Sequence, residues 1–298
     1  MSIDGIFFGV AALLAFGSVR VLQSRLIHRA GLFTALFWAY VTEGAFVALV
    51  FALSGARLSP SFRTVGLALL LGIIGAAAIA SFYRATQLGS VSIVSAVSQM
   101  FVVLTVALSL LFLGERLSWM RLGGVALAVS GAVLVSLKAA ALRLRFLRRE
   151  PSRVLRRERA RRGLAAGVPW AALTAVLWGV FFFAYRFLVA DAGVIGAALL
   201  VELAVMSCFV IAAFRFRLRR LDARSRWLAA AVGFLVALGA LAYNAGIAAA
   251  PVSLVASLAG ASPIVTALLA RTFLKEKLAI HQMVGIVVAF VGIVLLSL

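Results

Sequence analysis

The stretch Phe112–Ser118, FLGERLS, places one glutamate between two long apolar runs, and Phe273–Ala279, FLKEKLA, does the same near the far end of the chain. When Val103–Leu137 is laid over Ile264–Leu298 without gaps, 13 of the 35 aligned positions are identical. A composition rich in Leu, Ala and Val inflates such a match, but the identical positions also include both glutamates and two pairs of glycines. The two stretches therefore predict an internal duplication.

Most of the chain is apolar: 65% of its 298 residues are hydrophobic and only 13% are charged. An average soluble domain is about half apolar and about a quarter charged. A helix needs about 20 apolar residues to cross the hydrocarbon core of a bilayer. Runs of that length recur and predict an all-α polytopic membrane protein with ten transmembrane helices. We place the spans at residues 5–27, 32–54, 64–86, 90–113, 119–138, 168–190, 194–214, 227–249, 253–273 and 281–298.

An Arg-dense segment divides these spans five and five. The prediction is a first five-helix repeat over residues 1–138, a basic linker over 139–167 and a second five-helix repeat over 168–298. Gly17 with Gly179, and Tyr83 with Tyr243, occupy matching spans in the two halves. Because five is odd, two such units joined in series enter the membrane with opposite orientation. Inverted-topology repeats of this kind are typical of transporters, whose substrate site lies between the repeats.

The net charge of +20 comes mainly from basic residues in the connections between apolar runs. The odd-numbered connections carry 22 of the Lys and Arg residues and the even-numbered connections carry 4. In membrane proteins, an excess of Lys and Arg marks the cytoplasmic loops. The bias predicts a multi-pass protein of a bacterial-type inner membrane, with the basic linker 139–167 in the cytoplasm and both termini outside. Because these charges set topology, we do not interpret them as a nucleic-acid site.

Residues for common enzyme chemistry are scarce. The sequence contains no HExxH, GxSxG or GxxxxGK[ST] motif, and its single cysteine rules out an internal disulfide. We therefore predict no enzyme, no metal site and no cofactor. The histidines and aspartates all lie near the edges of predicted spans: His28, His281, Asp4, Asp191 and Asp222.

Two glutamates lie at membrane depth. Glu43 and Glu202 fall in the second and seventh spans, which are equivalent helices of the two repeats. A carboxylate in hydrocarbon is costly, so each is expected to face a cavity or a partner. Arg20, Arg84 and Arg186 also lie within spans and are the candidate partners. These groups either bind a substrate carboxylate or ammonium or carry coupling protons, or they form Glu–Arg pairs that only hold helices together.

Further polar and aromatic residues are candidates for the lining of a central cavity. Aromatic residues at helical spacing more often serve packing or interfacial belts than ligand contact. A buried Asn or Gln needs a hydrogen-bond partner, and a Pro removes a backbone donor from its helix. The first repeat has Val102 at the gapless equivalent of Pro263, so we expect the two halves to be unequally bent. In addition to Glu43, Glu202, Arg84 and Arg186, the candidates are Tyr83, Gln99, Trp178, Tyr185, Tyr243, Asn244 and Pro263.

Two other features are interpreted as structural. Gly124 and Gly131 lie seven residues apart on one helix face, and Gly285 with Gly292 repeats the spacing. Small residues allow close helix packing, here within the chain or, as the alternative, across a dimer interface. The glutamates of FLGERLS and FLKEKLA are expected near the positive N-terminal end of the helix that follows each, and Ser118 is expected to cap its helix.

The doubled arrangement resembles the EamA-type family of the drug/metabolite transporter superfamily. Two stretches carry the resemblance, LLFLGERLSWMRLGGVALAVSGAVLV and TFLKEKLAIHQMVGIVVAFVGIVLL, each with Leu-x-Glu-x-Leu before a helix with glycines seven apart. AVLWG (Ala175–Gly179) and ASPIVTALLA are similar to the Trp-Gly helix and the proline-containing ninth helix of that family. Three features depart from it. Phe16-Gly17 replaces Trp-Gly in the first repeat, the fourth span lacks a proline, and the family's termini are described as cytoplasmic.

The resemblance implies a carrier of small molecules without a catalytic cofactor, and many bacterial members export amino acids. We therefore expect a secondary transporter that exports amino acids or similar small amphipathic metabolites by alternating access. Its partners would be a small-molecule substrate and the lipid bilayer, without nucleic acid, and it would be a monomer or a homodimer. The alternatives are a membrane enzyme that acts on lipid or polyprenyl carriers and a non-transporting membrane scaffold.

Overall fold

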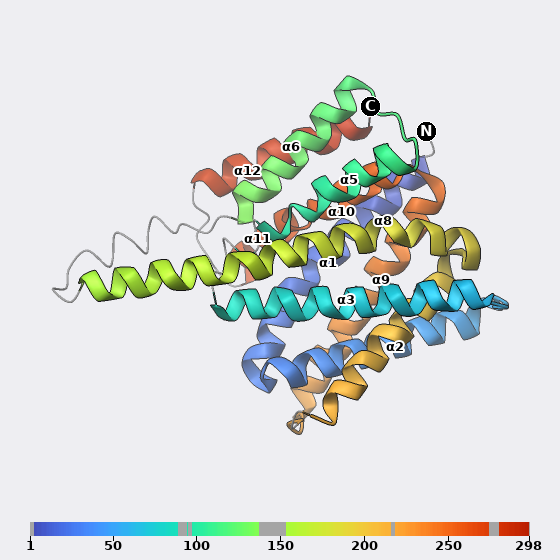
Figure 1. Cartoon of the computed structure of the whole chain (residues 1–298), viewed down its shortest axis with the longest axis horizontal. Helices are drawn as coiled ribbons and strands as arrows, with labels where there is room; N and C mark the ends of the chain where they lie inside the picture. The colour runs from blue at the N-terminus through green and yellow to red at the C-terminus, as the bar shows by residue number, and fades with distance from the viewer. Residues whose placement is uncertain are drawn as a thin grey trace.

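The computed structural model describes residues 3–88, 94, 97–136, 153–215, 218–273 and 280–297, and these residues form a bundle of α-helices (Figure 1). This all-helical architecture agrees with the predicted fold class. The helices are α1 (Ile3–Ala30), α2 (Leu32–Ser54), α3 (Phe62–Leu88), α5 (Phe101–Phe112), α6 (Trp119–Ser136), α8 (Arg153–Ala213), α9 (Ala223–Ala249), α10 (Val252–Gly260), α11 (Pro263–Phe273) and α12 (Ile280–Ser297).

Six helical segments in the described part of the chain are long and apolar enough to cross a membrane. They are Ile3–Ala30, Leu32–Ser54, Phe62–Leu88, Gly167–Ala213, Ala223–Ala249 and Val252–Leu269. Shorter apolar helical segments are Phe101–Phe112, Trp119–Leu134 and Ile280–Leu296. The segment Gly167–Ala213 covers the sixth and seventh predicted spans. The two spans meet at a kink in α8 at Gly193, where φ is 70°. Gly31 turns the chain between α1 and α2 with a φ of 81°. Glycine adopts this backbone conformation without steric cost, so two glycines mark equivalent turns in the two halves.

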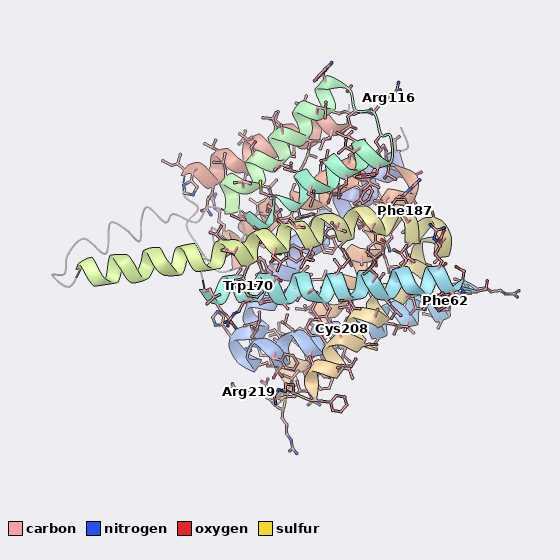
Figure 2. The ribbon with its side chains drawn as sticks, in the orientation of Figure 1. Phe62, Arg116, Trp170, Phe187, Cys208 and Arg219 are labelled. Atoms are coloured by element: carbon pink, nitrogen blue, oxygen red, sulfur yellow. The ribbon has the colours of Figure 1, made fainter. Side chains whose placement is uncertain are left out.

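Large apolar side chains cover the outside of the bundle. Phe62 is 96% exposed, and Trp170 and Phe187 are exposed as well (Figure 2). Extensive exposed apolar surface is unfavourable in water, but it is the surface that a helix bundle presents to lipid. The apolar helices and the apolar exterior together identify a polytopic membrane protein.

The predicted fourth and ninth spans are both interrupted. A turn at Gln99–Met100 precedes α5, and a turn at Ala261–Ser262 separates α10 from α11. Tight i→i−3 bonds close both turns, 3.0 Å from Met100 N to Val97 O and 3.1 Å from Ala261 N to Leu258 O. Both halves therefore break at this position, although only the second has a proline there. Gln99 Nε2 donates to the carbonyl of Gly260, so tertiary bonding joins the two turns without a proline in the first.

Two hydrogen bonds between the halves repeat the same pattern. Thr105 Oγ1 donates to Gly179 O at 3.1 Å, which joins α5 to α8. Thr266 Oγ1 donates to Gly17 O at 2.8 Å, which joins α11 to α1. Thr105 and Thr266 are matched positions of the duplication, as are Gly17 and Gly179. The duplication is therefore present in the tertiary contacts as well as in the sequence.

The paired glycines bring α6 and α12 together, and Figure 1 shows these helices side by side. A Cβ atom on Gly131 would lie 2.6 Å from Gly285 O, and one on Gly292 would lie 2.7 Å from Gly124 O. Real side chains do not approach a backbone oxygen this closely. The predicted packing role of the four glycines is confirmed, and the packing lies within one chain.

Glu115 does not lie at the start of the helix that follows it. Its Oε1 accepts a hydrogen bond from Val252 N at 2.6 Å, and its Oε2 accepts one from Ser253 N at 3.1 Å. The expectation was therefore wrong about which helix receives the charge. The loop before α6 folds back over α10, so the carboxylate meets the unpaired amides at the first turn of a helix from the other half.

The predicted cap at Ser118 is confirmed, since Arg121 N donates to Ser118 Oγ at 3.3 Å. The equivalent expectation for FLKEKLA falls largely on residues 274–279, which lie outside the described residues. The same holds for residues 139–152 of the predicted linker, whereas α8 already begins at Arg153.

The connections between helices meet in two groups. Arg29 Nη1 lies 3.7 Å from Asp222 Oδ2, and Arg219 N donates to Thr34 Oγ1 at 3.1 Å, so the first and seventh connections are neighbours. Glu115 joins the fourth connection to the eighth through its bonds to the start of α10. Odd connections thus meet odd ones and even connections meet even ones, as expected when successive spans alternate in direction.

Candidate functional site

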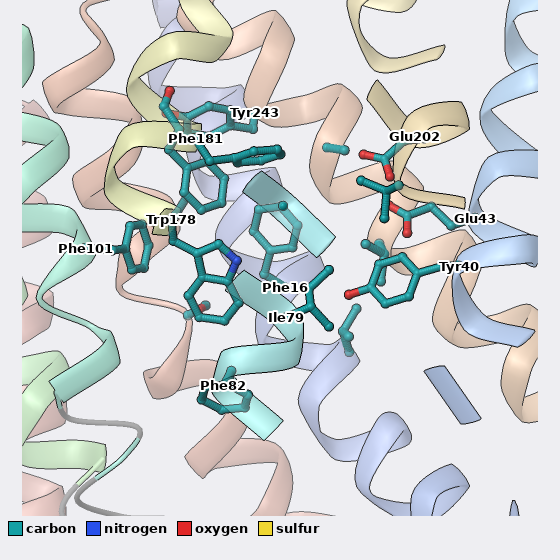
Figure 3. A pocket seen from close by; sticks show the side chains of 18 of the residues that line it. Phe16, Tyr40, Glu43, Ile79, Phe82, Phe101, Trp178, Phe181, Glu202 and Tyr243 are labelled. Atoms are coloured by element: carbon teal, nitrogen blue, oxygen red, sulfur yellow. The ribbon is translucent and has the colours of Figure 1, made fainter. Parts of the chain in front are cut away.

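A cavity of about 190 Å³ lies at the centre of the bundle (Figure 3). Side chains from both halves line it, from α1, α2, α3 and α5 on one side and from α8, α9 and α10 on the other. Ligand pockets for drug-sized molecules typically measure about 300–1,000 Å³. The central cavity is therefore suited to a smaller molecule. Its polar and charged lining residues are Arg20, Gln23, Tyr40, Glu43, Tyr83, Tyr185, Glu202, Tyr243, Asn244 and Ser262.

Aromatic rings form one wall of the cavity. Trp178, Phe182 and Tyr185 recur on one face of α8 because helical residues three or four apart share a face. The Trp178 ring centroid lies 6.0 Å from that of Phe101, and the Phe182 centroid lies 4.9 Å from that of Tyr243. These separations are typical of favourable edge-to-face aromatic pairs. The packed rings give the cavity a rigid apolar wall.

Two carboxyl groups face each other at one end of the cavity, which we call the acid end (Figure 3). Glu43 is 1% exposed and Glu202 is 7% exposed, and the two carboxyl groups lie next to each other (Figure 3). Among the described residues, no donor group hydrogen-bonds either oxygen of Glu43. Tyr40 lies beside the pair, and its ring stacks on Phe209 with centroids 4.7 Å apart.

A single arginine marks another part of the cavity, which we call the basic end. Arg20 Nη2 donates to Gln99 Oε1 at 3.3 Å, and its Cζ lies 5.9 Å from the centre of the Phe82 ring. Gln99 in turn donates to Gly260, which fixes the orientation of its amide. The guanidinium is thus held by one hydrogen bond and one cation–π contact, with further N–H groups remaining for a bound anion.

Asn244 and its neighbours connect the aromatic wall to the acid end. Asn244 Nδ2 donates to Val194 O at 3.3 Å, whereas its buried Oδ1 accepts no hydrogen bond from the described residues. The Tyr185 side chain lies beside Asn244 and Glu202. Tyr243 donates its hydroxyl hydrogen to Phe182 O at 3.0 Å, so this phenol serves to brace α9 against α8.

The structure brings most of the predicted site residues together. The lining includes Glu43, Tyr83, Trp178, Tyr185, Glu202, Tyr243 and Asn244. The other predicted residues, Arg84, Gln99, Arg186 and Pro263, are not part of the lining. Of these, Gln99 holds Arg20 in place, and Pro263 begins α11 after the turn.

The expected Glu–Arg pairs do not form in the described part of the chain. Arg186 donates instead to the carbonyl of Ile247, and Arg84 is exposed. Successive residues of a helix point about 100° apart. Because Tyr185 faces the cavity, its neighbour Arg186 faces away from it. Glu43 therefore lies beside the other glutamate (Figure 3) and not beside any arginine that the structure describes.

Several lining residues were not among the predicted site residues. Arg20 was considered as a partner for a glutamate and as a group that could bind a substrate carboxylate, but it was not among the site residues, and Phe16, Phe82, Phe101 and Ser262 were not proposed at all. An arginine inside an apolar run is a recognisable signal for a functional position. The apolar rings carry no such signal, because lipid-facing and cavity-facing phenylalanines look alike in the sequence.

The described residues include no group of three or more His, Cys, Asp or Glu that could hold a metal ion. The cavity offers instead a carboxyl pair, an arginine and an apolar wall. Such an arrangement can bind a small molecule that combines a cationic group, an anionic group and an apolar part.

The sequence model of the EamA-like transporter family matches residues 3–137 and again residues 165–298. No curated protein matches the chain. A solved crystal structure, described only as that of a protein, is similar with a TM-score of 0.79 and 20% sequence identity. The match covers 99% of this chain and 98% of the other, so the two share a fold over their whole lengths.

Proposed function

Because the chain belongs to the EamA-like transporter family, we propose that it is a secondary transporter that exports amino acids or similar small amphipathic metabolites. The proposed architecture is ten transmembrane helices in two inverted-topology repeats, residues 1–138 and 168–298, joined by a cytoplasmic linker at 139–167. The membrane is a bacterial-type inner membrane. Transporters of this kind bind substrate between their repeats and expose the site to each side in turn.

One observation carries the proposal: the central cavity is lined from both repeats and contains both a carboxyl pair and an arginine. An amino acid has an ammonium group, a carboxylate and a side chain of variable polarity. The acid end suits the ammonium group, Arg20 suits the carboxylate, and the aromatic wall suits an apolar side chain. A volume of about 190 Å³ favours a single small metabolite.

The contacts between the repeats support alternating access. Thr105 with Gly179 and Thr266 with Gly17 join the repeats at matched positions, as a pair of pivots would. Arg29 with Asp222, and Thr34 with Arg219, join the repeats at the odd-numbered connections. Glu115 joins them at the even-numbered connections. Opening the bundle at either end requires the contacts of that end to break, whereas the pivots can persist.

The two alternative functions have weaker support. A membrane enzyme that handles phosphorylated lipid carriers would gather Arg20, Arg84 and Arg186 around one cavity, but only Arg20 lines it. A scaffold without transport would have a packed centre, and here the centre is hollow. Both observations favour a carrier.

A thermal-stability screen of the detergent-purified protein tests the proposal. A ligand that binds only the folded protein at a concentration of 100 Kd stabilises it by about 2.7 kcal/mol. We expect at least one amino acid or related zwitterion to raise Tm, and Arg20→Gln to abolish the increase. Arg84→Gln is the matched control, because this arginine is exposed and outside the cavity. If no zwitterion raises Tm, or if both variants respond like the wild type, the proposed substrate class is wrong.

A further inference from the structure

The acid end of the cavity contains several buried oxygen atoms without a hydrogen-bond partner among the described residues. Both oxygens of Glu43 and Oδ1 of Asn244 are buried and accept no hydrogen bond from the described residues. Glu43 is 1% exposed and Asn244 is fully buried. A buried carboxylate without a partner is costly in a low-dielectric site, so these atoms require a positively charged or hydrogen-bonding occupant.

No residue of the described chain supplies that positive charge. Arg20 is the arginine that lines the cavity, but Gln99 and the Phe82 ring hold it at the basic end, and it forms no ion pair with either glutamate in the described part of the chain. Arg186, which the sequence offered as a partner, donates to Ile247 O. A positive charge at this end of the cavity must therefore come from outside the chain.

From these oxygens we infer that Glu43, Glu202 and Asn244 form a binding site for one compact monovalent cation. The donors are all oxygen atoms, which is the ligand set that hard cations prefer. A divalent ion takes about six or more oxygen ligands, whereas the side chains of Glu43, Glu202 and Asn244 offer five at most.

Two sources supply the same chemistry: a free Na⁺ ion, or a primary ammonium group on a transported molecule. Both present a small, unshielded positive charge to several oxygen acceptors. A quaternary ammonium such as choline does not, because its methyl groups keep the charge away from the carboxylates. The inference deepens the proposed function by assigning a ligand to one end of the same cavity.

Equilibrium binding to the purified protein tests the inference without requiring transport. We would measure Tm in detergent at constant ionic strength, with increasing NaCl or methylammonium chloride replacing choline chloride. The inference predicts that at least one of the two small cations raises Tm in a saturable way. A response to Na⁺ identifies a free ion as the occupant, and a response to methylammonium alone identifies an ammonium group of the cargo.

Substitutions at the acid end show which side chains bind the cation. Glu43→Gln and Glu202→Gln should each raise the apparent dissociation constant about tenfold or more, because each removes one of the charges that hold the cation. Asn244→Leu should weaken binding by a smaller factor, and Asn244→Asp should retain it. Glu115→Gln is the matched control, since this glutamate caps α10 outside the cavity lining, and it should keep the full cation response.

Two results would overturn the inference. One is a wild-type protein whose Tm is the same in sodium, methylammonium and choline chloride. The other is a saturable response that survives unchanged in the Glu43→Gln/Glu202→Gln double variant. Zwitterion binding is measured separately through its dependence on Arg20, so a failure of the cation site and a failure of the proposed function can be told apart.

Discussion

Glu115 provides a sharp test of how the two repeats are held together. Its carboxylate accepts hydrogen bonds from Val252 N at 2.6 Å and from Ser253 N at 3.1 Å, at the first turn of α10. Replacing Glu115 with Ala removes both acceptors and the negative charge at the helix N-terminus. Replacing it with Gln keeps one carbonyl oxygen but removes the charge.

The expected magnitudes follow from these contacts. A hydrogen bond to a charged group contributes about 1.5–3 kcal/mol, and a charge at a helix terminus contributes about 0.3–1 kcal/mol. Glu115 is partly exposed, so water replaces some of the lost bonding. We therefore expect Glu115→Ala to lower the free energy of unfolding by about 2–4 kcal/mol and Glu115→Gln by about 1–2 kcal/mol. At about 2 °C per kcal/mol, Tm should fall by about 4–8 °C and about 2–4 °C respectively.

The assay is thermal unfolding of the detergent-purified variants beside Arg116→Ala. Arg116 is the next residue of the same loop and is exposed, so its removal controls for changes in loop composition. The order of Tm should be wild type, Arg116→Ala, Glu115→Gln and Glu115→Ala, with the first two nearly equal. A Glu115→Ala protein as stable as Arg116→Ala would refute the cap as a stabilising contact between the repeats.

Other substitutions have equally defined outcomes. Gly131→Ala should lower the free energy of unfolding by about 1–3 kcal/mol, because its Cβ meets Gly285 O, whereas Gly123→Ala on the same helix meets no atom within 4 Å and should be neutral or stabilising. Denaturation of both variants in the same detergent compares their free energies of unfolding, and equal losses of stability would contradict the close packing of α6 and α12. Gln99→Leu frees Arg20, and should weaken zwitterion binding about three- to tenfold in a thermal-shift titration. An unchanged affinity would mean that the hydrogen bond to Gln99 does not position Arg20 for binding. The hydrogen bond from Ser225 lowers the pKa of the Asp222 carboxyl, so its stabilising effect is present above about pH 4 and lost as the pH falls further. Asp222→Ala should therefore be less stable than wild type at neutral pH and equal to it in acid, as a pH series of Tm values would reveal.

Much of the fold follows from local features of the sequence. Apolar runs of membrane-spanning length set the helices, and α2 matches its predicted bounds of residues 32–54. The matched Glu and Gly residues revealed the duplication, which recurs in the bonds of Thr105 and Thr266. Glu43 and Glu202 were identifiable as site candidates because a charge within hydrocarbon is costly wherever it lies.

The remaining features depend on contacts that no local pattern encodes. The break at Gln99–Met100 has no proline, and it is stabilised by a bond to Gly260, 161 residues away. A separation of 137 residues likewise hid the role of Glu115, whose partner Val252 begins α10. Arg20 and Arg186 both lie within predicted spans, and the rotation of each helix about its axis decides which of them reaches the cavity. Packing between helices sets that rotation.

Counterflow in proteoliposomes tests the central claim most directly, namely that the cavity between the repeats carries a small amphipathic molecule across the membrane. Vesicles loaded with an unlabelled amino acid mixture would receive a trace of each labelled amino acid outside. The wild type should accumulate at least one label transiently, Arg20→Gln should slow this about tenfold or more, and Arg84→Gln should not. A wild type that accumulates no label, or an Arg20→Gln variant as fast as wild type, would contradict the account.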